Sequence, residues 1–221
     1  GRRFPIAAAS GLLMSGFALL VASLGMANPQ ITPLVPVLRS PWLSLHVSLI
    51  MVSYALLGLL MLNGTAALAL VATARTGTSE RTSRTLARLR LFGQLLLYPA
   101  VFLLTAGIFT GAVWANASWG RYWGWDPKEV WALITLIVYA LPLHGQSLAR
   151  FRRPLFFHAY TLWAFAAVLM TYFGVNYLLG GMHSYGGGFR PGYAAATILA
   201  AVTAFALLTV AALIRQRRMD A

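Results

Sequence analysis

The chain has 221 residues, of which 59% are hydrophobic and only 10% are charged. Its mean hydropathy of +0.72 is well above that of ordinary water-soluble domains, which predicts that a lipid bilayer surrounds the protein. The sequence has no cysteine, which excludes disulfide bonds and thiolate–metal sites within this chain and leaves other side chains to bind any metal.

Six long apolar stretches follow one another, and each approaches or exceeds the roughly 20 residues needed to cross a bilayer as a helix. They cover residues 5–28, 43–73, 91–115, 130–148, 155–179 and 192–214. The sequence therefore predicts an all-α integral membrane protein, a bundle of six transmembrane helices forming one domain over residues 1–221. The first stretch is long and lacks an obvious cleavage site, so we interpret it as a helix and not as a signal peptide. Because residue 1 is glycine and not methionine, we expect the chain to be a segment of a longer protein.

The net charge of +13 would also suit a nucleic-acid-binding protein. The positions of the basic residues along the chain distinguish this possibility from a membrane protein with basic loops. Most basic residues fall at the two termini and in the loops 74–90 and 149–154, which lie on one side of a six-span bundle. The positive-inside rule then predicts cytoplasmic termini and outer loops at 28–42, 114–129 and 180–191. We expect the arginine-rich segment 75–90 to be a solvated helix or linker on anionic membrane lipid, and we expect no nucleic-acid partner. Four basic residues remain on the outer side, namely Arg39, Arg121, Lys128 and Arg190.

The second outer loop differs in composition from the rest of the chain. Residues 114–131 hold five of the seven tryptophans and two of the four acidic residues. An aromatic belt at the membrane surface would account for one or two tryptophans. Five of them, interleaved with glycines, instead predict a flat aromatic shelf for a large planar apolar ligand. Asp126 also has the sequence context of a helix N-cap, with Pro127 at the first helical position and Glu129 at the third.

Four histidines occur, and ionisable residues in membrane helices are candidates for function because burying them is costly. His46 and His183 lie at the outer ends of the second and fifth predicted helices, level with the tryptophan loop. Two imidazoles beside an aromatic shelf suit axial ligation of haem iron, whereas zinc would require further ligands. His144 lies roughly 22 Å deeper than Glu129, at 1.5 Å per residue. It is therefore either an interfacial residue or a ligand of a second site. His158 has the same two interpretations and no supporting motif, so we expect it to be structural.

The segment 119–129, WGRYWGWDPKE, resembles the tryptophan-rich WWD signature of haem-handling proteins in cytochrome c biogenesis. With the stretches 131–135, 40–48, 172–177 and 183–185, it is most similar to the CcsA or ResC type, a subunit of system II cytochrome c synthase, and less similar to CcmC and CcmF. These segments run from about residue 40 to residue 185.

The resemblance implies that His46 and His183 ligate haem b at the outer face and that His144 is one ligand of a transmembrane haem. The partner ligand for His144 would come from a companion subunit, CcsB or ResB, or from an N-terminal half that this chain lacks, so we expect an incomplete synthase. The implied reaction is thioether formation between the haem vinyl groups and a reduced CXXCH motif of apocytochrome c, in the bacterial inner membrane or a plastid thylakoid membrane.

Because no side chain need act as a nucleophile, we expect catalysis by orientation. We assign orientation of the haem to Trp119, Trp123, Trp125, Asp126 and Glu129, and further haem contacts to Trp114, Tyr122 and Arg121. Arg121 and Lys128 are candidates either for binding the haem propionates or for ordinary interfacial contacts. Two alternatives stay open: a CcmC-like exporter or presenter of haem without ligation activity, and a metal-free transporter or structural subunit.

Overall fold

The computed structural model describes residues 8–9, 11–13, 15–16, 19, 38–74, 79–179, 181–182 and 192–220. Within these residues the chain is helical and contains no strand, which confirms the predicted all-α class. The main helices are α2 (Pro41–Ala72), α3 (Ser79–Trp119), α4 (Pro127–Ala140), α5 (Pro154–Leu169), α6 (Val175–Leu178) and α7 (Gly192–Asp220). Short 3₁₀ turns at Leu141–His144 and Ala149–Arg152 connect α4 to α5, and a π-helical turn, Met170–Gly174, joins α5 to α6.

Four helical stretches are long and apolar enough to cross a membrane, so the protein is a multi-pass membrane protein. They are Pro41–Ala72, Glu80–Trp119, Pro154–Leu178 and Ala196–Met219. The predicted span 130–148 differs, because α4 has only 14 residues and ends at Ala140, before Pro142 in the 3₁₀ turn. Most of the predicted first span lies outside the described residues, so the count of six remains a prediction.

Helix α3 is much longer than the sequence predicted. Residues 79–90, which were expected to be a solvated helix or linker, are helical and continue directly into the predicted span 91–115. Trp114 to Trp119, assigned to an outer loop, form the last turns of the same 41-residue helix. Residues 79–90 are rich in helix-forming arginine and leucine, and Glu80 stands in the first turn, where negative charge favours the helix dipole. Thr82, Leu86 and Leu89 are buried at helical spacing, so packing continues into this part of α3.

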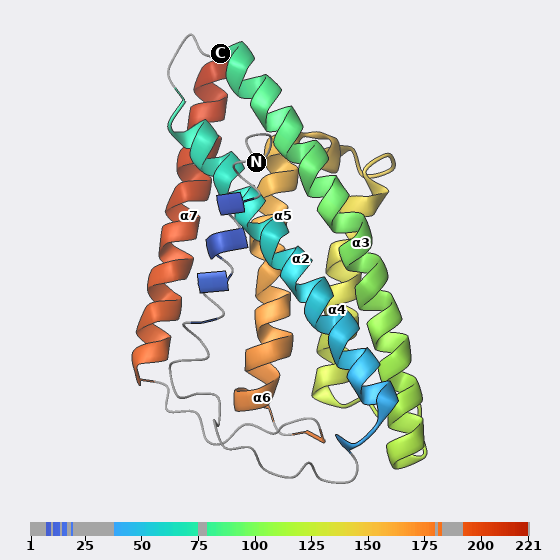
Figure 1. Cartoon of the computed structure of the whole chain (residues 1–221). Helices are drawn as coiled ribbons and strands as arrows, with labels where there is room; N and C mark the ends of the chain where they lie inside the picture. The colour runs from blue at the N-terminus through green and yellow to red at the C-terminus, as the bar shows by residue number, and fades with distance from the viewer. Residues whose placement is uncertain are drawn as a thin grey trace.

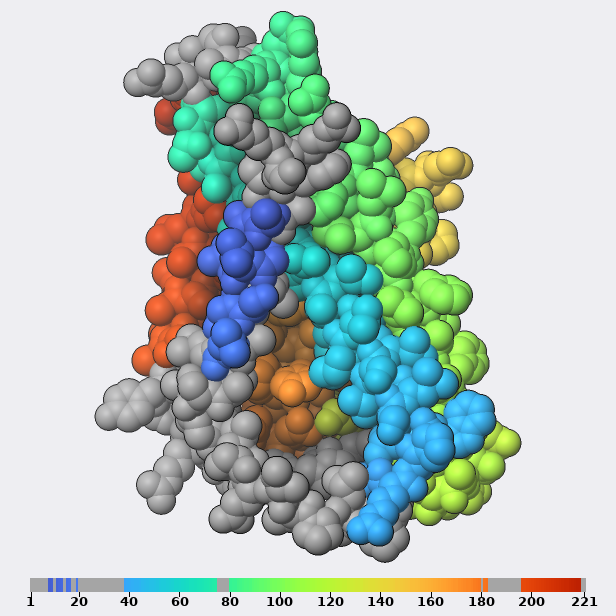
Figure 2. All heavy atoms as spheres, in the orientation of Figure 1, coloured from blue at the N-terminus to red at the C-terminus, as the bar shows by residue number. Residues whose placement is uncertain are grey.

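The helices pack around α2, which contacts α3, α5 and α7. Figure 1 shows α2 running obliquely between α7 and α3. In the space-filling view, α5 is visible mainly at the base of the gap between α2 and α7 (Figure 2). One core cluster joins α2, α3, α4 and α5 around Leu57, Leu97 and Phe157, and a second joins α2, α3, α5 and α7 around Leu68 and Leu162.

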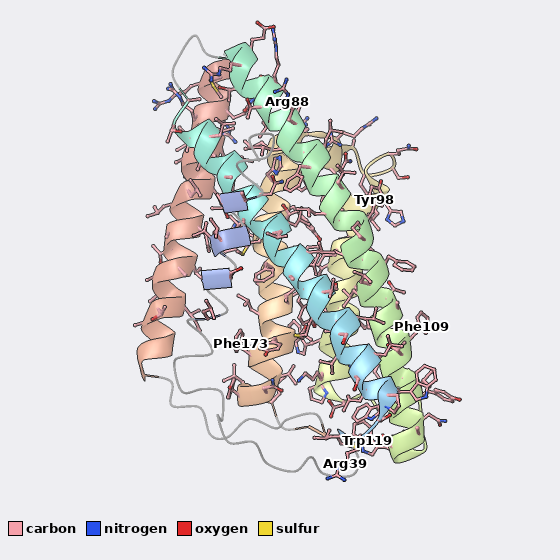
Figure 3. All side chains as sticks on the ribbon, viewed as in Figure 1. Arg39, Arg88, Tyr98, Phe109, Trp119 and Phe173 are labelled. Carbon is pink, nitrogen blue, oxygen red and sulfur yellow. The ribbon has the colours of Figure 1, made fainter. Side chains whose placement is uncertain are left out.

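The two ends of the bundle differ in chemistry. The beginning of α3 and the end of α7 lie at one end, which we call the arginine end because it carries Arg81, Arg84, Arg217 and Arg218 (Figure 1). At the opposite end, Trp119 lies close to the beginning of α2 (Figure 3). We call this the tryptophan end. The protein thus separates its arginine-rich helix ends from its tryptophan-rich segment, as the sequence pattern predicted.

Candidate functional site

A cavity of about 430 Å³ opens at the tryptophan end, which is within the size range of small-molecule and cofactor sites. Residues from α2, α3, the loop between α3 and α4, α4, and the segment from the π-helical turn into α6 surround it, so five parts of the chain meet there. Most of the lining is apolar. The polar or aromatic members are His46, Tyr54, Trp114, Tyr122, Trp123, Lys128, Glu129, Thr171, Tyr172 and Asn176.

His46 is held in one orientation by α3. Its Nδ1 lies 2.6 Å from the carbonyl oxygen of Gly107, and because a carbonyl can only accept, Nδ1–H donates this hydrogen bond. That tautomer places the lone pair on Nε2, which is the form of imidazole that ligates metals. Gly111, one turn further along α3, makes room for the ring, since a Cβ there would lie 2.6 Å from His46 Nδ1 and Cε1. Gly111 therefore leaves a notch for the histidine ring, whereas Gly107 supplies the acceptor carbonyl and leaves room for Ile50, one turn further along α2.

Four of the five tryptophans in residues 114–131 form two edge-to-face pairs and not one flat surface. Trp114 and Trp119 on α3 have ring centroids 4.8 Å apart, and Trp123 and Trp125 in the loop are 5.9 Å apart. Trp114 and Trp123 line the cavity, whereas Trp119 and Trp125 do not. Trp125 is 73% exposed and has a φ of 57°, a left-handed conformation that is strained for a bulky residue. The predicted aromatic shelf is therefore divided: Trp114 and Trp123 line the cavity, Trp119 packs against Trp114, and Trp125 is exposed.

The acidic pair starts α4 as the sequence predicted. Asp126 is the N-cap and accepts a hydrogen bond from the Lys128 backbone N–H, while Glu129 Oε2 accepts from the backbone N–H groups of Gly124 and Asp126. This reciprocal capping box fixes the loop to the helix. Glu129 also lines the cavity, whereas Asp126 is buried beside it.

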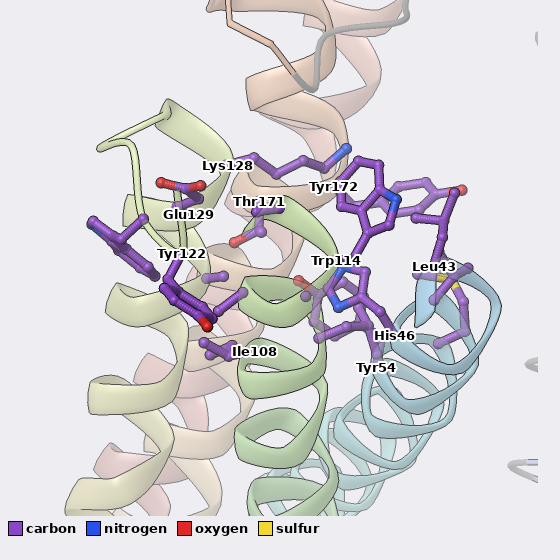
Figure 4. Close-up of a pocket in the computed structure, with 18 of the residues that line it drawn as sticks. Leu43, His46, Tyr54, Ile108, Trp114, Tyr122, Lys128, Glu129, Thr171 and Tyr172 are labelled. Carbon is purple, nitrogen blue, oxygen red and sulfur yellow. The ribbon is translucent and has the colours of Figure 1, made fainter. Parts of the chain in front are cut away.

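Lys128 and Arg121, the two candidate cations, occupy different positions. Lys128 lines the cavity and donates from Nζ to Asn176 Oδ1 at 2.8 Å; Figure 4 shows it reaching from α4 towards Tyr172. Burial lowers the pKa of Lys128 from its usual range, and the Asp126 carboxylate partly opposes that shift. Arg121 instead packs against Gly124 and donates to Met182 Sδ at 3.3 Å, and it does not line the cavity. Lys128 is therefore the cation placed to meet an anionic group of a ligand in the cavity.

The remaining predicted histidines lie elsewhere. His144 is exposed at the far end of the 3₁₀ turn after α4, and its Nδ1 lies 2.9 Å from the Ala140 carbonyl oxygen, so it does not share the cavity with His46. His158 is fully buried in α5 beside α2 and α3, where a Cβ on Gly64 would lie only 2.7 Å from its carbonyl oxygen. His183 lies outside the described residues. The structure thus places one of the proposed ligands, His46, at the cavity.

Several lining residues were not identified as site residues from the sequence. The hydroxyl groups of Thr135 and Thr171 form a hydrogen bond of 2.9 Å, and Tyr54 and Thr171 line the cavity. The π-helical turn that contains Thr171 leaves no sequence signal, although such turns occur frequently at functional sites. Asn176 stands in a segment that carried the family resemblance, but its contact with Lys128 depends on how α4 and α6 pack.

Comparison with known proteins identifies the family. The model of the family described as "Cytochrome C assembly protein" matches residues 3–183. The chain is 43% identical over 182 residues to protein NrfI of Wolinella succinogenes, covering 82% of this chain and 20% of NrfI. It is 38% identical over 183 residues to the cytochrome c biogenesis protein CcsA of Chlamydomonas reinhardtii, covering 79% of this chain and 48% of that protein. CcsA of Parasynechococcus marenigrum is 38% identical over 213 residues, covering 82% of this chain and 68% of that protein.

The chain thus spans between one fifth and about two thirds of the length of these relatives. The match nevertheless includes the described helices α2 to α6, the tryptophan loop and the cavity between them. The chain belongs to the cytochrome c assembly protein family, as a CcsA-type cytochrome c biogenesis protein.

Proposed function

We propose that this protein binds haem b in the cavity at the tryptophan end, on the outer face of the bacterial inner membrane or of a plastid thylakoid membrane. With a CcsB- or ResB-type companion subunit, it delivers the haem to the CXXCH motif of apocytochrome c, where the haem becomes covalently attached. Haem is the substrate of this process. The proposal extends the family assignment to a ligand, a partner and a reaction.

The orientation of His46 is the observation that carries the proposal. Histidines that bind metals characteristically donate their second ring N–H to a backbone carbonyl or a carboxylate, which fixes the tautomer and the ring plane. His46 has this arrangement with Gly107, at the wall of a mainly apolar cavity. The described residues contain no group of three His, Asp or Glu side chains able to hold a bare metal ion. A planar metal complex that brings its own four equatorial ligands needs only axial histidines, and that requirement fits His46 with His183 as the second ligand.

The lining of the cavity also suits an amphipathic ligand. Apolar residues such as Val47, Ile50 and Ile108 would contact a macrocycle, and Trp114 and Trp123 add aromatic surface. Lys128 is half-buried, and its ammonium donates a hydrogen bond to the neutral side chain of Asn176, so it can still gain from an anion. Haem has apolar faces and two carboxylates at one edge, and we assign one propionate to Lys128.

Thioether formation adds a thiol across a haem vinyl group, and the haem supplies that carbon–carbon double bond. The side chains here would hold the ring plane and exclude water, while the capping box keeps the tryptophan loop rigid around the site. His144 would ligate a second, transmembrane haem with a histidine from the companion subunit. Its exposed position at the end of the 3₁₀ turn leaves room for such a partner.

The test is the absorption spectrum of the detergent-purified protein made with its companion subunit, reduced and oxidised. We expect a b-type spectrum that His46→Ala weakens and that added imidazole restores. His144→Ala should remove a separate fraction of the haem. Ser48→Ala is the matched control, because Ser48 is exposed on α2 and its hydroxyl donates to the Ser44 carbonyl of its own helix. Absence of haem from every preparation would overturn the proposal.

Covalent attachment is tested separately by adding a reduced apocytochrome. Haem that resists denaturation and acid–acetone extraction supports ligation. Haem that binds normally but stays extractable would instead indicate a presenter that hands haem to another protein.

A further inference from the structure

The buried carboxylate of Asp126 makes a contact that helix capping does not require. Oδ2 accepts the Lys128 backbone N–H at 3.1 Å, which is the capping bond, while Oδ1 accepts the Met182 backbone N–H at 2.6 Å. Asp126 is only 6% exposed, so both bonds are largely shielded from water. Serine, threonine or asparagine would serve as an N-cap. The second carboxylate oxygen therefore connects the tryptophan loop to a segment 56 residues further along the chain.

Two further contacts show that this connection is closely packed. Gly181 has no Cβ, and a Cβ there would lie 2.6 Å from Asp126 Oδ1 and 3.1 Å from Pro127 Cδ. The chain can approach the carboxylate this closely because residue 181 is glycine. On the other side of the loop, Arg121 donates from Nη2 to Met182 Sδ at 3.3 Å. Asp126, Pro127 and Arg121 thus hold the Gly181–Met182 pair against the beginning of α4.

We propose that Asp126 is a positioning residue that clamps the Gly181–Met182 pair, which directly precedes the proposed ligand His183, onto the tryptophan loop. The effect of this clamp on haem ligation rests on the proposed function. His183 follows Met182 directly, and consecutive Cα atoms are about 3.8 Å apart, so anchoring Met182 limits the positions open to the His183 backbone. Restricting a ligand before the metal complex arrives lowers the entropic cost of binding.

The clamp also connects the beginning of α4 to the residue that precedes His183. Asp126 begins α4, which carries Lys128 and Glu129 to the cavity, and the same carboxylate holds the residue that precedes His183. A hydrogen bond to a charged acceptor is worth more than a neutral one, and losing it should raise local opening by about tenfold or more.

The first measurement is hydrogen–deuterium exchange at the Met182 amide in haem-free protein. Asp126→Ser keeps an oxygen for capping but has no second oxygen to reach Met182, so it should raise exchange at Met182 about tenfold or more while the first turn of α4 stays protected. Gly181→Ala should have the same effect with Asp126 intact. Asp126→Ala removes cap and clamp together and should expose both regions. Unchanged exchange at Met182 in Asp126→Ser and Gly181→Ala would overturn the clamp.

The second measurement is the coordination state of the haem-loaded protein. Asp126→Ser and Gly181→Ala should convert six-coordinate low-spin haem towards five-coordinate high-spin haem, and imidazole should restore the low-spin spectrum. A general loss of folding would lower haem content without rescue by imidazole. Faster exchange at Met182 with an unchanged spectrum would overturn the positioning role. If wild-type protein binds no haem, the proposed function fails, whereas the exchange measurement still decides whether the clamp exists.

Discussion

A histidine packs against a glycine of a neighbouring helix in two regions, His46 at the tryptophan end and His158 in the interior near the arginine end. The surroundings of the two rings differ. At the tryptophan end, His46 fills a notch at Gly111, donates to Gly107 and lines a cavity. In the interior, His158 is fully buried, and its ring lies beside the Leu86 carbonyl without a well-aligned hydrogen bond. Burial of a histidine alone therefore does not indicate a ligand, whereas a fixed tautomer at the wall of a cavity favours one.

Polar neighbours reinforce this difference. Around the cavity, Lys128, Asn176 and Glu129 all make hydrogen bonds with good geometry. Near His158, Asn63 donates to the Leu89 carbonyl, but its Oδ1 has no hydrogen-bond partner in the described structure. The polar side chains at the tryptophan end thus line a cavity, whereas the interior around His158 is closely packed.

Filling the notch at Gly111 should have the largest effect on haem binding. In Gly111→Leu the new Cβ would occupy the space 2.6 Å from the His46 ring and displace it from Gly107. Because displacing the oriented ligand costs at least as much as losing its supporting bond, we expect a 10- to 100-fold loss of haem affinity. Haem titration of the purified protein measures this. Gly145→Ala is the control, since the nearest atom to its Cβ would be 3.6 Å away. Unchanged affinity in Gly111→Leu would contradict the role of the notch.

Adding a Cβ at Gly64 should lower the stability of the protein and leave its haem affinity unchanged. A Cβ at Gly64 would lie 2.7 Å from the His158 carbonyl oxygen, and backbone atoms cannot move away as a flexible side chain can. We expect Gly64→Ala to lower the free energy of unfolding by about 1–3 kcal/mol. Thermal unfolding in detergent measures this, again beside Gly145→Ala. A variant that stays stable but loses haem would place a ligand-binding function in the interior.

Removing the cation of Lys128 should weaken haem binding by about tenfold, the effect of one charge-assisted hydrogen bond. The protonated form binds the propionate, and burial lowers the pKa of Lys128, so affinity should fall with rising pH earlier than it would for an exposed lysine. Haem titration across alkaline pH should show this fall in the wild type. Lys128→Arg should keep its affinity over the same range, and Lys128→Met should be weak throughout. Equal affinity of Lys128→Met and wild type would exclude a propionate contact.

Replacing His158 should have the smallest effect. An apolar side chain of similar size removes ring nitrogens that lack well-aligned partners, and such changes are close to neutral. We expect His158→Leu to change the free energy of unfolding by less than about 1 kcal/mol and to leave haem content unaltered. Thermal unfolding and a haem assay on one preparation check both. Loss of haem in this variant would show that the interior histidine takes part in binding.

Much of the fold followed from local pattern. Hydropathy located the regions that become α2, α3, α5 and α7, and the Asp126–Pro127–Glu129 pattern located the beginning of α4 and its capping box. The full length of α3 was missed. The arginine-rich segment was expected to be a helix or linker separate from the membrane span, and the tryptophan-rich segment was assigned to a loop, but both continue the same helix. The early end of α4 was missed because residues 141–148 are apolar enough to resemble membrane helix, while Pro142 and the 3₁₀ turn end it.

The candidate site was predicted in composition but not in arrangement. Tryptophans, acidic residues and His46 were identified, yet the sequence could not show that Trp114 and Trp123 line the cavity while Trp119 and Trp125 do not. It also left Arg121 and Lys128 equivalent. The structure separates them, because Arg121 folds back on Gly124 and Met182 while Lys128 reaches Asn176.

The sequence by itself determined that this is a helical membrane protein, which end carries the tryptophans, and its membership of the cytochrome c assembly family. These properties depend on hydropathy, charge placement and motifs that are read along the chain. Only the tertiary structure decided which face of each helix meets the cavity, which glycines admit a histidine ring, and that Asp126 binds the Met182 amide. The physical reason is that these contacts join residues far apart in the chain, such as His46 with Gly107 and Gly111, and they depend on helix rotation and close packing that no local pattern specifies.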